Sequence, residues 1–193
     1  MKNASSPLRP PSVLAIAYAP PHVRVRLAWL LALDQRLSDV LGRASEPMIA
    51  QLRLSWWRDA LNAAPEKWPK GEPLFAELAA IGADDVLISA SLSLVDAFEI
   101  LALSAESQER ATAQMQRISA LCKAFSDWIG DRERNVAHVD QIARWWLNPE
   151  SAMPKPVSRV LRSLSILAFA EKLDDGKSRS SPLRLNWHAL TGR

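Results

Sequence analysis

The sequence predicts an all-α fold, and three observations lead to that class. Only 6 of the 193 residues are glycine, which disfavours the frequent tight turns of β-sandwiches and of glycine-looped nucleotide folds. Apolar residues recur at spacings of three and four along several long segments, whereas no segment shows clean alternation. Hydrophobic residues make up 48% of the chain, which is enough for the core of one ordinary domain.

Composition along the chain predicts one helical domain between two polar ends. Residues 1–12 are polar and proline-rich, and we expect them to be disordered. Residues 13–175 carry the helical patterns, and residues 176–193 form a basic C-terminal tail.

Four helices are expected in the first half of the helical domain. A first helix runs from Pro21 to about Arg43, and a second from Pro47 to Leu61 with Ser45 as its N-cap. The first helix has an apolar face made of Leu27, Leu30, Leu37 and Leu41. After a proline-rich loop, a short helix covers 73–81. The fourth helix covers 86–104, is capped by Asp84-Asp85 and is apolar almost all round.

Three more helices are expected in the second half. The first covers 106–129 and ends at Gly130. Its predicted buried stripe consists of Met115, Ile118, Cys122, Phe125 and Ile129. A charged link then leads to a helix over 136–147, and the last helix covers 156–173.

Charge and cysteine content exclude several function classes. The net charge of +3, without a basic stripe, argues against a nucleic-acid partner. The single cysteine, Cys122, excludes an internal disulfide, and its place in an apolar stripe favours a core residue over a nucleophile.

The chain gives little indication of export or membrane insertion. The apolar stretch 13–19 is short for a signal peptide, and Pro20 would follow the cleavage site. Segment 86–105 contains Asp96 and Glu99 near its centre, which makes it a poor transmembrane span. We expect a cytoplasmic protein without a transmembrane span, and peripheral contact with the inner membrane stays open.

Acidic residues inside helical faces are the first candidates for a site, since P-loop, GxGxxG, HExxH and GxSxG motifs are missing. Asp34 lies on the apolar stripe of the first helix, and Asp96 lies on the nearly all-apolar helix. A carboxylate on such a face is costly unless it is paired or lines a wet cavity. One interpretation is buried Asp–Arg pairing with Arg24, Arg53 or Arg58. The other is a cavity lined by acids and arginines, suited to Mg²⁺ and a diphosphate.

Two pairs of adjacent tryptophans are unusual. Trp56-Trp57 lies between Arg53 and Arg58, and a second pair occupies 145–146. Adjacent residues on a helix point about 100° apart, so the two rings of a pair meet different neighbours. Packing is the default interpretation, and an aromatic binding box is the alternative.

Three segments resemble the squalene/phytoene synthase family, especially its divergent bacterial branch and the related mitochondrial complex I assembly factors. Tyr18-Ala19-Pro20 through Arg24, followed by the helix 27–40, is similar to the first core helices of that family. Glu46-Pro47 followed by the segment LRLSWWRDAL at 52–61 is similar to its "RLxWWRdAL" signature and is the most specific match. Segment 158–173 with the ending LTGR at 190–193 resembles the terminal helix and tail.

The resemblance implies an isoprenoid-synthase-like helical bundle, shortened relative to active members. Active members hold Mg²⁺ with two aspartate-rich motifs and join two prenyl diphosphates head to head. The first motif, DDxxD, would fall on residues 38–42, where Asp39 matches and Ser38 and Gly42 replace acids. Asp34 lies one helical turn before Ser38, and the second motif has no match.

The resemblance therefore implies a set of candidate site residues. Asp39 and Asp34 would bind Mg²⁺ if the protein is active, and no cofactor is expected otherwise. The residues expected to contact substrate are Arg24, Asp34, Ser38, Arg53 and Asp96.

Three hypotheses follow. The first is a catalytically degenerate member that binds an isoprenoid, such as a prenyl diphosphate, or a partner protein. The second is an active Mg²⁺-dependent prenyl transferase, and the third is an unrelated helical interaction module.

Overall fold

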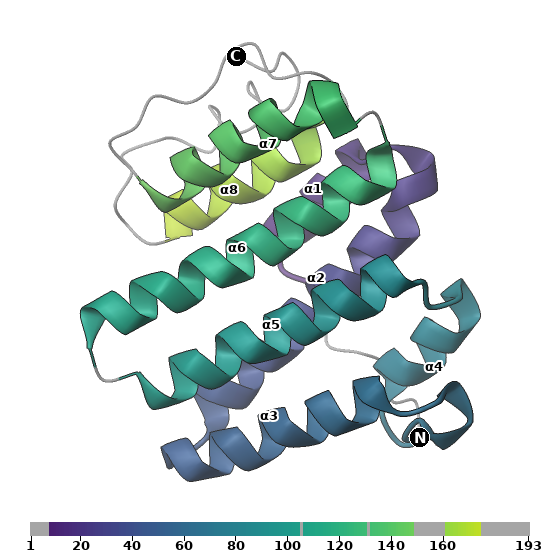
Figure 1. Ribbon diagram of the computed structural model, residues 1–193, viewed down its shortest axis with the longest axis vertical. Helices are drawn as coiled ribbons and strands as arrows, with labels where there is room; N and C mark the ends of the chain where they lie inside the picture. Colours follow the sequence, from purple (N-terminus) through teal and green to yellow (C-terminus); the bar gives the residue numbers. More distant parts are fainter. Residues whose placement is uncertain (1–7, 105, 131, 149–160, 175–193) are drawn as a thin grey trace. The chain divides into compact units, whose positions relative to one another are not determined.

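The computed structural model describes residues 8–104, 106–130, 132–148 and 161–174 (Figure 1). Over these residues the chain forms α-helices and one short 3₁₀ turn, without a β-strand, so the predicted all-α class is confirmed. The elements are α1 (Pro10–Tyr18), α2 (Pro21–Arg43), α3 (Pro47–Asn62), η1 (Pro65–Lys67), α4 (Pro73–Ile81), α5 (Asp85–Leu103), α6 (Ser107–Ile129), α7 (Arg132–Leu147) and α8 (Arg162–Asp174).

The helices belong to two compact units. The first contains residues 29–124, and the second contains residues 9–28 and the chain from 125 onward. Helices α2 and α6 each contribute to both units.

In the first unit, α3 packs side by side with α5 (Figure 1). Its largest fully buried side chains come from α2 through α6: Leu30, Leu33, Leu37, Leu54, Phe75, Leu78, Leu87, Leu94 and Leu121. The indole N–H of Trp29 on α2 donates to the backbone carbonyl of Leu74 on α4 at 2.7 Å. Because a buried polar group without a partner is costly, this bond fixes where α4 meets α2.

In the second unit, α8 packs against both α1 and α7. The rings of Trp145 and Phe169 stack with centroids 6.0 Å apart, and the indole N–H of Trp146 donates to Glu171 at 2.9 Å. Both tryptophans are buried, which confirms packing as the role of this second pair.

Two helix ends follow the expected capping chemistry, whereas the start of α3 does not: its N-cap residue is Glu46 rather than the predicted Ser45, and no side chain caps it. The carboxylate of Asp84 accepts from the Leu87 amide at 2.7 Å, which confirms it as the N-cap of α5. Gly130 follows the last residue of α6 with φ of +67°, which favours glycine there.

Four further expectations about helical structure need correction. Residues 10–12, assigned to the disordered segment, begin α1, because proline fits the first turn of a helix. Helix α1 itself was not expected, and α7 begins at Arg132 rather than at 136. Met115 is 50% exposed, and Ala113 takes the buried place on that turn of α6. The expectations for 1–7, 156–160 and 176–193 fall outside the described residues.

Among the described residues, one helix, α5, is long and apolar enough to cross a membrane. Length and composition alone do not separate a span from the core helix of a folded domain. In this fold α5 packs along α3, and seven of its residues are buried.

Candidate functional site

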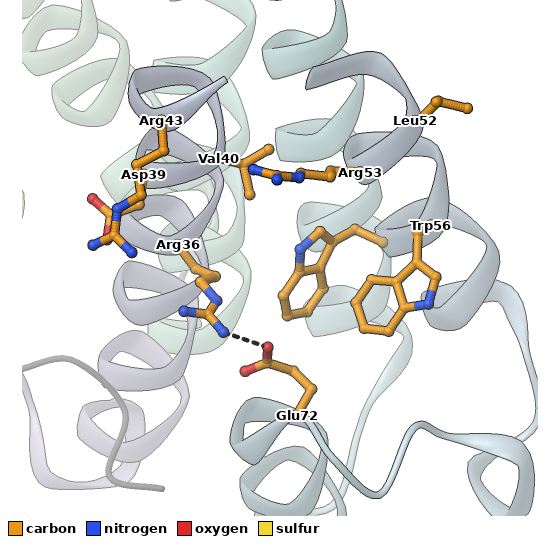
Figure 2. Close-up of a pocket in the computed structure, with 9 residues that line it drawn as sticks. Arg36, Asp39, Val40, Arg43, Leu52, Arg53, Trp56 and Glu72 are labelled. Carbon is orange, nitrogen blue, oxygen red and sulfur yellow. Dashed lines mark hydrogen bonds and ion pairs between the residues drawn. The ribbon is translucent and has the colours of Figure 1, made fainter. Parts of the chain in front are cut away.

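A cleft of about 470 Å³ opens in the first unit between the C-terminal half of α2 and helix α3 (Figure 2). Its walls carry charged and apolar side chains together. The lining residues are Arg36, Asp39, Val40, Arg43, Leu52, Arg53, Trp56, Trp57 and Glu72.

Two of the three arginines in the cleft are neutralised by carboxylates. Arg36 pairs with Glu72 at 2.7 Å, and Arg43 lies 3.8 Å from Asp39 on the same helix. Arg53 extends from α3 toward Val40 on α2 and has no ion pair or hydrogen bond within the described part of the chain (Figure 2). The cleft therefore has one uncompensated positive charge, which favours an anionic group.

An aromatic cluster forms the α3 side of the cleft. Trp57 is buried and stacks on Phe75 with centroids 5.3 Å apart. Trp56 meets Trp57 edge to face at 5.2 Å, yet 43% of Trp56 stays exposed. Packing is thus confirmed for Trp57, whereas Trp56 presents an indole face to the cleft rim.

Asp34 does not line this cleft. Its two carboxylate oxygens accept from Nε and Nη2 of Arg117 on α6, both at 2.6 Å, in a bidentate pair. Both side chains are 11% exposed. The predicted Asp–Arg pairing is confirmed, but the partner is Arg117 rather than Arg24, Arg53 or Arg58. The sequence gives no local signal for this partner, which lies 83 residues away.

Asp96 is also held by an arginine. Arg58 on α3 binds Asp96 and, at 2.5 Å, Glu99 on α5. This partner was among those expected from the sequence, whereas Glu99 was considered only as an obstacle to membrane insertion. Burial raises the pKa of Glu99 above its ordinary value, because the loss of hydration outweighs the attraction of Arg58.

The remaining candidates are not among the residues that line the cleft. Arg24 belongs to the second unit, where its guanidinium donates to the carbonyls of Ala17 and Ala19 and so fixes the α1–α2 corner. Ser38 is half-buried on α2 and is not among the lining residues. Of the predicted site residues, the structure brings Asp39 and Arg53 together.

The described residues do not fit the Mg²⁺ site that the resemblance implies. Magnesium needs carboxylate oxygens that converge on one octahedral position. Asp34 gives both oxygens to Arg117, while Asp39 faces Arg43 in a cleft that Asp34 does not reach. The structure also groups no three His, Cys, Asp or Glu side chains that could hold a metal ion, within the ranges it describes.

The comparisons agree with the resemblance over the N-terminal half. Residues 11–100, just under half of the chain, match the family model of squalene/phytoene synthase. No curated protein and no solved structure matches. The cleft lies entirely within the matched range, and over that range the match argues against the hypothesis of an unrelated interaction module. Over residues 11–100 the chain is squalene/phytoene synthase-like, with an all-α, isoprenoid-synthase-like fold.

Proposed function

We propose that this chain is a catalytically degenerate relative of the squalene/phytoene synthases that binds an isoprenoid with an anionic head in the α2–α3 cleft. We place it in the divergent bacterial branch of that family, related to the mitochondrial complex I assembly factors. A role in assembling a partner protein at the cytoplasmic side of the inner membrane is part of the same proposal.

The pairing of the acids is the observation that carries the proposal. Ionising an allylic diphosphate requires metal ions that stabilise several developing negative charges. In this chain Asp34 and Asp96 are bound by arginines, and Asp39 is left as the one cleft acid at the motif position. Such a site lacks the two facing carboxylate walls that hold magnesium in active members.

The volume, charge and aromatic lining of the cleft support the binding of an isoprenoid with an anionic head. A volume of about 470 Å³ lies within the ordinary range for small-molecule sites. The unpaired guanidinium of Arg53 suits a phosphate group, and the exposed face of Trp56 suits an apolar tail. Ligand binding is thus expected without Mg²⁺.

The test is a thermal-shift titration with farnesyl diphosphate, with and without Mg²⁺. A ligand at 100 times its Kd stabilises the folded state by about 2.7 kcal/mol, and we expect the same shift under both conditions. Arg53→Gln should weaken the shift. Lys123→Gln, which removes an exposed cation on α6 away from the cleft, is the matched control. The absence of any shift in the wild-type protein would refute the proposal.

Asp39 favours a second candidate, an active prenyl transferase with a rebuilt metal site. Its side chain is 26% exposed and lines the cleft with Arg53, whereas Glu72, the other acid of the lining, is paired with Arg36 at 2.7 Å. This candidate predicts Mg²⁺-dependent release of pyrophosphate from farnesyl or geranylgeranyl diphosphate, abolished by Asp39→Ala. Release that persists in the variant would refute the role of Asp39.

A further inference from the structure

A stripe of exposed apolar side chains runs along α3 beside the cleft. Met48, Leu52 and Trp56 are spaced by four residues and therefore share one face of the helix. They are 71%, 68% and 43% exposed. The opposite face of α3 is buried through Leu54 and Leu61. Large apolar side chains gathered on one exposed face indicate an interaction surface. We call these three residues the α3 stripe.

The α3 stripe is continuous with the cleft. Leu52 and Trp56 belong to both, and Figure 2 shows them one turn apart on α3. One uncompensated cation, Arg53, lies on the same helix as the stripe, and Arg43, 71% exposed and paired with Asp39 at 3.8 Å, lies across the cleft. Asp59, exposed and one turn beyond Trp56, ends the stripe.

This combination matches the chemistry of an anionic bilayer surface. Methionine and leucine side chains gain free energy by leaving water for the acyl boundary. An indole is favoured at the headgroup level, because its ring is apolar and its N–H is polar. Exposed arginines are attracted to anionic headgroups. A protein partner would need an apolar groove together with anionic groups placed against Arg43 and Arg53.

We propose that the α3 stripe lies against an anionic membrane surface and turns the mouth of the cleft toward the lipid headgroups. An amphipathic ligand then enters with its anionic head at Arg53 while its tail stays along Leu52 and Trp56. The second step rests on the proposed function, whereas the docking of the stripe does not.

The experiment is vesicle flotation of the whole chain with phosphatidylcholine alone and with phosphatidylcholine mixed with phosphatidylglycerol. Met48→Gln is the test variant, since Met48 is in the stripe but does not line the cleft. Met115→Gln is the matched control, because it makes the same substitution at an exposed methionine on α6 (Met115 is 50% exposed), outside the stripe and the cleft lining. Circular dichroism of both variants establishes that they are folded.

We expect the wild-type protein to float with the mixed vesicles and to be released at high salt, because salt screens the arginines. Met48→Gln should lower the partition coefficient by about tenfold, as expected for losing most of the burial of one large apolar side chain. Met115→Gln should leave the coefficient within about twofold of the wild type, since an exposed residue outside the stripe loses no burial.

Several results would overturn the docking surface. They are an absence of flotation in the wild type, equal losses in the two variants, or dimerisation through Met48 without vesicle binding. Flotation without a farnesyl diphosphate shift would keep the docking surface and refute the proposed function. A farnesyl diphosphate shift without flotation would keep the proposed function and refute the docking surface. Met48→Gln should show the same farnesyl diphosphate shift as the wild type.

Discussion

Removing Arg117 should destabilise the first unit strongly, because it leaves the Asp34 carboxylate buried without a partner. Both side chains are 11% exposed, and each carboxylate oxygen accepts one guanidinium hydrogen bond at 2.6 Å. Leu30, Leu33 and Leu37, which lie beside Asp34 on α2, are fully buried. Breaking a buried pair by deleting one partner costs about 3–5 kcal/mol, so we expect Arg117→Ala to lose that much free energy of unfolding.

The assay is urea denaturation of the wild type, Arg117→Ala and the double variant Asp34→Leu/Arg117→Met. Replacing both members of a buried ion pair with apolar side chains is often neutral or stabilising, so the double variant should recover most of the loss. Arg43→Ala is the control, since its 3.8 Å pair with Asp39 is 71% and 26% exposed. Deleting one partner of such an exposed pair should cost about 1 kcal/mol or less.

Two results would refute the reasoning. A loss below about 1 kcal/mol in Arg117→Ala would show that the Asp34 charge is satisfied by solvent or by other groups. A double variant no more stable than the single one would show that Arg117 acts through packing rather than through its charge. Loss of the farnesyl diphosphate shift in a folded double variant would instead make the Asp34–Arg117 pair part of the ligand-binding site.

Three further substitutions test other parts of the fold. The pKa of Glu99 is raised above 4.5 in the folded state, so the stability of the wild-type protein should fall as the pH rises from 4.5 through the raised pKa. Glu99→Gln removes the titrating group and one partner of Arg58, so its urea midpoints should not show this fall with pH. Gly82→Ala should cost about 1–3 kcal/mol by thermal unfolding, because L side chains rarely adopt its φ of +75°, although no neighbour lies within 4 Å of the added Cβ. Trp29→Phe should cost about 1–3 kcal/mol in urea, because the buried carbonyl of Leu74 loses its donor.

Helices with strong local signals were predicted closely. The range 73–81 matches α4 at both ends, where Pro73 starts the helix and Gly82 follows it with positive φ. Asp84 caps α5 as expected, because an N-cap depends on residues within one turn. Helix α1 was missed, since its prolines indicate a loop as readily as a first turn.

The site depends on contacts that periodicity does not contain. A helical face shows that Asp34 is buried, but the residue that neutralises it comes from α6. The same limit applies to Met115, whose exposure depends on what packs against that turn of α6. The cleft residues Asp39 and Arg53 were identified through the family resemblance, whereas Arg36 and Glu72 had no motif to mark them.

The way the acids are held also constrains any residual catalysis. For Mg²⁺ to bind Asp34, the metal would have to displace both hydrogen bonds that Asp34 accepts from Arg117 and leave that arginine, 11% exposed, without its carboxylate. That cost adds to the dehydration that Mg²⁺ already resists. Binding of a metal to Asp39 would not carry this cost, because its partner Arg43 is 71% exposed and lies 3.8 Å away. Under the proposed function, we therefore expect any magnesium dependence at this cleft to involve Asp39 rather than Asp34, and a ligand held by Arg53 to bind without metal.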